Sequence, residues 1–458
     1  MKSQAHHKRS RPKAIFIRKY PSKKTNNSNS NSNSKCTMAA TASQTSAAQN
    51  AAYDIPELYR MRPAVVDALE TDSSAMQQDT IEECLPFLLG EEDLGPRNVH
   101  GIPLLDKQRH LNFLRKQLGP LPGAFMAADP SRPWFFYWCL AAMSLLGEDV
   151  AFYREKLVET VRPMQNATGG FAGGQGQMSH LATTYATILS LALVGGEAAY
   201  DVVDRKSMWH WLGSLKQPDG GFQMAIGGEE DVRGAYCQTY EGGISAKPSV
   251  EAHGAYAFCA LGCLSIIDSP HRGIPRHLDL PRLISWLSSR QYAPEGGFSG
   301  RTNKLVDGCY SHWVGGCWPL IEASISGPQE GFAAEAATPA TEARSLFSRN
   351  GLIRYILCCC QDLSKRGGMR DKPSKNSDAY HSCYVLSGLS LAQHKWTMKS
   401  ARLDATVLGS DEWVVTPYLE GQQIFSEDDR LATTHPVYVI PQHKADDIRD
   451  YFVNKAGF

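Results

Sequence analysis

One short segment of the sequence combines a carboxylate and a thiol that could bind the same metal ion. Asp307 and Cys309 stand two residues apart, a spacing that lets both side chains reach one ion from a turn. His381 lies at the matching position of the next sequence repeat. Three ligands of O, S and N type with a fourth position open are typical of catalytic zinc. For the Asp/Cys pair taken alone, a surface acid beside a buried thiol is the alternative.

A basic segment just before this pair could bind a phosphate group. Arg301 and Lys304 precede Tyr310, and His253 comes from the preceding repeat. Arginine can hold a phosphate in a bidentate fork and lysine can act as a point charge. A solvated basic turn is the alternative. The glycine pairs of the sequence lack the GxGxxG and GxxxxGK[ST] patterns, so we expect no nucleotide-binding loop.

Aromatic residues fall near the same positions of the repeats. Aromatic side chains at helical spacing most often belong to a core, but here they coincide with ionisable groups, which favours a long apolar pocket with a polar mouth. The aromatic residues in question are Trp134, Tyr137, Trp138, Tyr256, Trp313, Tyr380 and Tyr384.

A repeated signal must position these residues. Five Gly-Gly-apolar triplets, each a few residues after a glutamine, begin at Gly169, Gly220, Gly242, Gly296 and Gly367. Apolar segments of helical period flank them, and paired glycines let the chain leave a helix and reverse tightly. Strand patterns are sparse. The sequence therefore predicts an all-α fold of stacked helical hairpins with a period of about 50 residues.

The repeat also places polar residues in a common phase. Tyr185 and Tyr236 lie 16 residues after the first glycine of their pairs, and Tyr256, Tyr310 and His381 lie 14 residues after theirs. Equivalent positions of a stacked array fall on one rim, so we expect these groups to converge. The alternative is that polar residues here only cap the inner helices. The polar residues near this phase are His180, Arg233, His253, Arg301, Lys304, Asp307, Cys309 and Asp378.

One spacing breaks the pattern. Successive glycine pairs are 51, 22, 54 and 71 residues apart. Between Phe222 and Gly242 there is room for a loop and for the beginning of a helix at 233–237, but not for the rest of that helix and the next one. About one hairpin of residues is absent near 237–238.

The bulk properties exclude some classes of protein and leave others open. Lys plus Arg equals Asp plus Glu, at 47 each among 458 residues, so no net charge favours nucleic acid. No apolar run is long enough for a transmembrane helix. Twelve cysteines without framework spacing favour a reducing compartment.

Three segments outside the repeats carry their own predictions. Residues 1–53 form a basic, Asn/Ser-rich segment that we expect to be disordered, with a mitochondrial transit peptide or a start at Met38 as alternatives. A single helical domain is predicted for 54–458. Its insertions at 322–344 and 395–430 are expected to be surface loops.

Four blocks together resemble the β subunits of protein prenyltransferases. They are Pro133-Trp-Phe-Phe-Tyr-Trp138, Glu251-Ala-His-Gly-Ala-Tyr-Ala-Phe-Cys259, Arg301-Thr-Asn-Lys-Leu-Val-Asp-Gly-Cys-Tyr-Ser-His-Trp313 and Asp371-Lys-Pro-Ser-Lys-Asn-Ser-Asp-Ala-Tyr-His-Ser-Cys-Tyr384. The resemblance extends from about Leu58 to the end of the chain. It implies an α6-α6 barrel, a partner α subunit of helical repeats, and transfer of a prenyl group from a diphosphate to the cysteine of a C-terminal CaaX motif in the cytoplasm.

The same resemblance implies a role for each site residue. Zinc (Zn2+) would be held by Asp307, Cys309 and His381, and magnesium (Mg2+) with the diphosphate by Asp371. Lys375 would act on the departing diphosphate and, with Tyr310, complete the catalytic set. The prenyl diphosphate would contact His253, Arg301, Lys304, Tyr310, Trp313, Tyr256, Cys259, Tyr236, Arg233 and Tyr384. The peptide would contact Trp134, Trp138 and Tyr380.

Three alternatives remain open at this stage. Trp134 with Tyr384 fits the family pattern for farnesyl diphosphate, whereas a type I geranylgeranyl-transferring subunit is the other enzyme. In the family, a helix and its successor separate Asp231–Cys237 from Gln238–Gly243, whereas here Cys237 directly precedes Gln238. This departure raises the third alternative, an inactive form that binds the α subunit or CaaX peptides without turnover.

Overall fold

The computed structural model describes residues 69–218, 221–231, 237–328, 346–399, 412–419 and 423–457. All of them belong to the unit Asn50–Phe458. The predicted tail at 1–53, together with Arg233 and Tyr236, lies outside the described residues. Among the residues that are described, no helix is long and apolar enough to cross a membrane.

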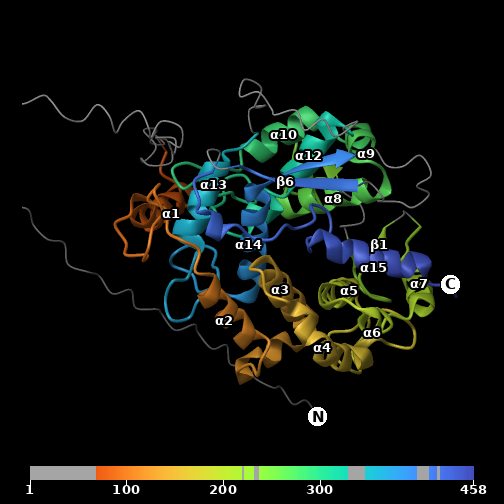
Figure 1. Ribbon diagram of the computed structural model, residues 1–458. Coiled ribbons are helices and arrows are strands. Elements are labelled where there is room, and N and C mark those ends of the chain that lie inside the picture. The colour runs from red at the N-terminus through yellow and green to blue at the C-terminus, as the bar shows by residue number, and fades with distance from the viewer. Residues whose placement is uncertain are drawn as a thin grey trace, which may run out of the picture. The chain divides into compact units, whose positions relative to one another are not determined.

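Apolar helices that are largely buried form the inner layer of this unit, and we call them the inner helices. They are α3 (Arg132–Leu145), α5 (Leu181–Val194), α8 (Gly254–Ile267), α11 (Tyr310–Trp313) with its continuation α12 (Cys317–Ser326), and α14 (Ala379–Gln393). α3 packs against α5 and α14 (Figure 1). α14 packs against α11, and α11 packs against α8. The inner helices therefore form a continuous series from α5 to α8.

More polar helices alternate with these along the chain and form an outer layer. They are α2 (Lys107–Gln117), α4 (Arg154–Val161), α7 (Arg205–Leu215), α10 (Leu280–Ser288) and α13 (Arg349–Tyr355), the last followed by a π-helical turn at Ile356–Cys360. α10, for example, buries only Leu283, Trp286 and Leu287, which follow the spacing of one helix face. The all-α prediction is confirmed.

The glycine pairs join the two layers by close approach. A Cβ atom on Gly297 would lie 2.7 Å from the ring of Tyr355, and one on Gly243 would lie 2.4 Å from the ring of Trp286. Both aromatic residues belong to the outer helix that follows the pair. Glycine is needed here because any side chain would displace that helix.

The remaining helices cover the ends and sides of these layers. They are α1 (Asp72–Leu89), α6 (Glu197–Tyr200), α9 (Pro270–His277) and α15 (Gln442–Asn454), with short 3-10 turns at Gly123–Ser131, Val150–Tyr153, Arg162–Met164 and Glu427–Asp429.

Three short antiparallel pairs of strands complete the described structure. They are β1 (Phe222–Gln223) with β2 (Glu230–Asp231), β3 (Cys237–Gln238) with β4 (Ile244–Ser245), and β5 (His394–Lys399) with β6 (Glu412–Pro417). Cys237 thus lies in a strand and not in the helix expected at 233–237, of which 233–236 lie outside the described residues.

The segment 395–430 departs from its prediction as a surface loop. Its β5–β6 hairpin buries Trp396, Met398 and Trp413, and β5 packs against α12. Alternating apolar residues in β5 make one face of the hairpin part of the core. In the other predicted loop, 322–344, helix α12 continues to Ser326, and residues 329–345 lie outside the described residues.

The candidate active site

A tight turn and the first turn of α14 bring three potential metal ligands together. The backbone N–H of Cys309 donates to Asp307 Oδ1 at 2.8 Å, which fixes the carboxylate beside the thiol. His381 comes from the start of α14, and one ligand atom from each of the three residues lies within 4.8 Å of the others. Gly308 between them packs against Arg370, because its Cβ would lie 2.8 Å from that carbonyl oxygen.

Asp378 orients the histidine of this trio. Its Oδ1 accepts the backbone N–H of His381 at 2.7 Å as the N-cap of α14, and its Oδ2 lies 2.7 Å from His381 Nδ1. Nε2 is therefore turned toward Asp307 Oδ1, at 3.2 Å. A carboxylate behind the far nitrogen is the usual support of a metal-bound histidine.

The electrostatics of the trio favour a cation between its members. Burial disfavours the imidazolium, but hydrogen bonds to Asp307 and Asp378 outweigh it and raise the pKa of His381 to about 10. Burial also opposes ionisation of Asp307, yet the hydrogen bond and charge of His381 lower the pKa of this carboxyl. Burial, followed by the negative charge of Asp307, raises the pKa of the Cys309 thiol. A bound cation would remove these penalties, so the donor set fits zinc.

Asp371 lies close to this trio but is engaged by a lysine. Its backbone oxygen accepts the N–H of Gly308 at 2.9 Å, which ties the two turns together. Lys372 Nζ contacts both Asp371 carboxylate oxygens at 2.7 Å, and both side chains are largely buried. Burial first, and the charge of Asp307 second, raise the pKa of Asp371. A magnesium ion at Asp371 stays a prediction.

The candidate anion site begins at the N-terminus of α8. His253 Nδ1 accepts the N–H of Ala255 at 3.1 Å, so the proton of the neutral ring is on Nε2, which lies 3.2 Å from the Tyr310 hydroxyl. Burial, followed by the charge of Arg301, lowers the pKa of His253, and burial raises that of Tyr310. Both groups are therefore neutral hydrogen-bond donors at neutral pH.

The two cations of this region are more exposed. Arg301 forms a 3.0 Å ion pair with Glu251, a residue to which the sequence had given no role. The turn that follows exposes Lys304 after Asn303, whose positive φ of 56° is one that asparagine tolerates. Lys375 lies in a similar exposed turn after Lys372.

A continuous aromatic wall joins the predicted peptide and lipid residues. Trp134 stacks on Trp138 at 5.5 Å, and Trp138 meets Tyr380 edge-on at 5.5 Å. Tyr380 in turn lies 4.9 Å from Tyr384, which lies 4.5 Å from Trp313. The structure therefore brings these five residues together, as the repeat phase predicted.

The wall also meets the metal-ligand trio and the anion site. Tyr380 lies 5.1 Å from the His381 ring, and its hydroxyl accepts the Trp313 indole N–H at 3.0 Å. Half-buried Tyr256 lies 5.5 Å from the ring of His253. Phe258, which the sequence reasoning missed, extends the wall at 5.7 Å from Trp313. Cys259 is half-buried on the same helix.

Three of the polar residues at the common position of the repeats also cap inner helices, as the alternative interpretation predicted. His180 caps α5, His253 caps α8 and Asp378 caps α14, each accepting a backbone N–H of the first turn. For His253 and Asp378 the remaining atoms point into the candidate site, so capping and site chemistry coexist.

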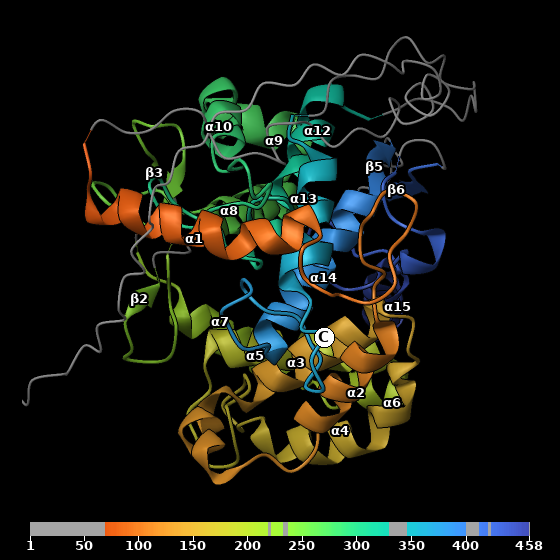
Figure 2. The same ribbon diagram turned by 90° about the vertical axis from the view of Figure 1, so that its left-hand side faces the viewer.

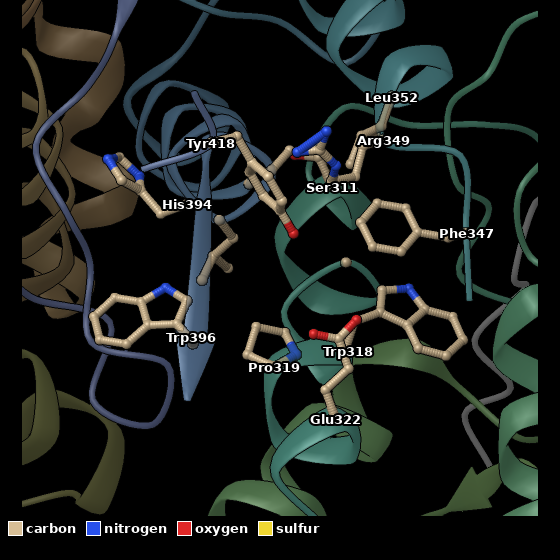
Figure 3. A pocket seen from close by; sticks show the side chains of 14 residues that line it. Ser311, Trp318, Pro319, Glu322, Phe347, Arg349, Leu352, His394, Trp396 and Tyr418 are labelled. Carbon is tan, nitrogen blue, oxygen red and sulfur yellow. The ribbon is translucent and has the colours of Figure 1, made fainter. Parts of the chain in front are cut away.

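A separate small cavity lies behind α11, between α12, α13, α14 and β5 (Figure 3). Its volume of about 20 Å³ is enough for one water molecule and far too small for a substrate. Trp318, Glu322 and Trp396 line it, and burial raises the pKa of Glu322. We do not assign catalysis to this cavity.

Comparisons with known proteins agree with this geometry. Residues 105–238 and 235–440 match the prenyltransferase alpha-alpha toroid domain. A protein farnesyltransferase subunit beta of Pyricularia oryzae is 52% identical over 450 aligned positions, which cover 88% of this chain and 85% of that protein. Its Schizosaccharomyces pombe counterpart is 36% identical over 412 positions, covering 84% of this chain and 98% of that protein.

A solved structure supports the fold alone. Candida albicans protein geranylgeranyltransferase-I complexed with GGPP superposes with a TM-score of 0.57 at 19% identity, over 76% of this chain and 99% of that chain. Together these matches define a prenyltransferase with an α-α toroid. The chain belongs, within that class, to the family of protein farnesyltransferase β subunits.

Proposed function

We propose that this chain is the catalytic β subunit of a zinc-dependent protein farnesyltransferase. It transfers farnesyl from farnesyl diphosphate to the cysteine thiol of a C-terminal CaaX motif, in the cytoplasm and in complex with an α subunit. The observation that carries the proposal is the convergence of Asp307, Cys309 and His381 beside the aromatic wall.

The residues of the chain divide the reaction between them. When bound by the trio, zinc lowers the pKa of a cysteine thiol so that the sulfur is a nucleophilic thiolate at neutral pH. His253 and Tyr310 donate hydrogen bonds to the diphosphate, and Arg301 and Lys304 stabilise the charge that grows on it as the carbon–oxygen bond breaks. Lys375 acts on the same leaving group, and Asp371 would hold magnesium beside it.

The aromatic residues orient both substrates. Trp134, Trp138 and Tyr380 hold the peptide, while Trp313, Tyr256, Cys259 and Tyr384 line the prenyl cavity. For Tyr236, contact with the prenyl chain stays a prediction, as does a role for Arg233 near the junction of peptide and isoprenoid, because both residues lie outside the described residues. Bulk at Trp134 and Tyr384 favours the shorter farnesyl chain over geranylgeranyl.

The test is an assay of prenyl transfer and metal content on the chain co-expressed with its α subunit. We expect about one zinc per chain and preferential farnesyl transfer to a CaaX peptide, both lost in Cys309→Ala. A soluble heterodimer that binds zinc but transfers nothing would favour the second candidate, an inactive form. That candidate has one observation in its favour, the short spacing between Gly220 and Gly242.

A further inference from the structure

The inner helices α5 and α8 end their series without meeting each other. Each inner helix packs on the next one in the series, in the order α5, α3, α14, α11 and α8. Among the described residues, no extended contact joins α5 to α8. In Figure 2, α8 lies in the upper half of the view and α5 in the lower half. Five inner and five outer helices are described, one pair fewer than an α6-α6 toroid contains.

The glycine pairs show where the sixth pair of helices belongs. Four of them pack under an aromatic ring of an outer helix: Gly170 under Trp211, Gly243 under Trp286, Gly297 under Tyr355 and Gly368 under Phe113. For the first three, that helix is the next outer helix along the chain, and the fourth pair returns to α2. After the remaining pair, at 220–221, the described residues up to Gly242 contain only strands β1 to β3 and no helix. No outer helix that could cover this pair is present among the described residues.

The family match divides at the same place, and the alignments leave positions of both relatives without a counterpart in this chain, summed over all their gaps. The match to the toroid domain is divided in two, and its parts meet at 235–238. In the S. pombe alignment, 84% of 458 residues is about 385, so about 27 of the 412 aligned positions have no counterpart here. The P. oryzae alignment leaves more, about 47 of its 450 positions. The spacing of 22 residues between Gly220 and Gly242 is shorter than the usual spacing of about 50 residues by a number of residues similar to that in the S. pombe alignment.

The helices that flank this break expose apolar residues toward solvent. On α8, Cys263, Ile266 and Ile267 fall within about 100° of the helix circumference, at roughly 100° per residue. Ile266 is 38% exposed, Ile267 is 56% exposed and Cys263 is also exposed. This stripe has the width of a face that normally packs against another helix.

α5 shows the same feature on its N-terminal half. Leu181, Tyr185 and Ile188 lie within about 60° of one another around the helix, and Tyr185 is 45% exposed. The rest of α5 is almost fully buried. Both end helices of the inner series, α5 and α8, therefore expose an apolar face. One element placed between these two helices would cover both faces.

We propose that α5 and α8 form a vacant docking surface for one helical hairpin of about 27 residues, which a longer form of this chain carries between Cys237 and Gln238. Its first helix lies between α5 and α8. Its second helix packs over the glycine pair at 220–221. The chain with the hairpin has a closed series of six inner helices.

The test inserts, between Cys237 and Gln238, the residues of the S. pombe relative that align there. We expect the inserted chain to unfold at a higher temperature, by about 3 °C or more, and to bind less of a hydrophobic dye such as ANS than the 458-residue chain. A glycine–serine linker of the same length is the control, and we expect it to change neither property in that direction.

The variant Ile267→Asn tests whether the inserted hairpin buries the exposed face of α8. It should change the melting temperature of the 458-residue chain by no more than about 1 °C, and lower that of the inserted chain by about 3 °C, because the side chain is buried only in the inserted chain. Ile325→Asn is the matched control, since Ile325 is also 56% exposed near the end of a helix, and it should be neutral in both. Earlier unfolding or aggregation of the inserted chain, equal stabilisation by the linker, or a neutral Ile267→Asn in the inserted chain would each overturn the proposal. None of these readouts depends on prenyl transfer.

Discussion

The two sides of the toroid differ in completeness. On the metal side, formed by α3, α11 and α14, inner helices pack on one another and hold the ligand trio and the aromatic wall. On the interrupted side, formed by α5 and α8, apolar residues of both helices are exposed. A repeat protein is stabilised by nearest-neighbour contacts, so the loss of one repeat affects its neighbours first. Metal binding should therefore be more robust than transfer in this chain.

The largest effect is expected on the metal side itself. Asp307→Ala removes one of three ligands and leaves His381 without the carboxylate beside its Nε2 atom. Since changes in residues that only support the ligands already cost about tenfold to a hundredfold, we expect zinc affinity to fall by more than about a hundredfold. Competition with a chelating dye measures the affinity, and Asp129→Ala, at a half-exposed acid that pairs with Arg132 away from the trio, is the control. Unchanged affinity would show that zinc does not bind at this trio.

The pH dependence of metal affinity sharpens the assignment of the ligands. The pKa of His381 is raised to about 10 and that of Cys309 is also raised, so both hold protons at neutral pH in the metal-free chain. Protons compete with the metal, and affinity must rise with pH as about two of them are released. We expect an increase of about a hundredfold per pH unit between pH 6 and 8. An affinity independent of pH would contradict this pair of ligands.

The support of the histidine should have a smaller effect. Asp378→Asn keeps the hydrogen bond that caps α14 but replaces the acceptor behind His381 Nδ1 with an amide N–H donor. We expect zinc affinity to fall by about tenfold to a hundredfold with little change in the melting temperature. Asp378→Ala, which also removes the cap, should lower both. If both variants bind zinc as tightly as the unchanged chain does, the only role of Asp378 is to cap the helix.

The smallest effect concerns the anion site, which borders the interrupted side. Glu251→Gln releases Arg301 from an exposed ion pair, and such pairs are worth about 0 to 1 kcal/mol. We expect binding of farnesyl diphosphate to tighten by about twofold to fivefold, measured by fluorescence titration at low salt. Arg301→Gln should weaken it. A tighter complex only in the chain with the inserted hairpin would show that the interrupted side limits diphosphate binding.

Much of the site could be predicted because the repeat places it. The glycine pairs and the phase of Tyr310 and His381 predicted which residues meet, and the trio and the aromatic wall are assembled in the structure. The position of a residue within the repeat does not show which side chains from other positions will contact it. Two ion pairs were therefore not predicted, that of Glu251 with Arg301 and that of Lys372 with Asp371. Ion pairs depend on side-chain direction as well as on sequence position.

The sequence by itself determined the all-α class, the period, the candidate ligands and the place of the break, because all of these follow from residue type and spacing along the chain. Only the tertiary structure decided which nitrogen of His381 faces Asp307, that β5 and β6 join the core, and which faces of α5 and α8 the short repeat leaves exposed. The physical reason is that these features depend on contacts between distant segments, and no local pattern records the direction from which a neighbour approaches.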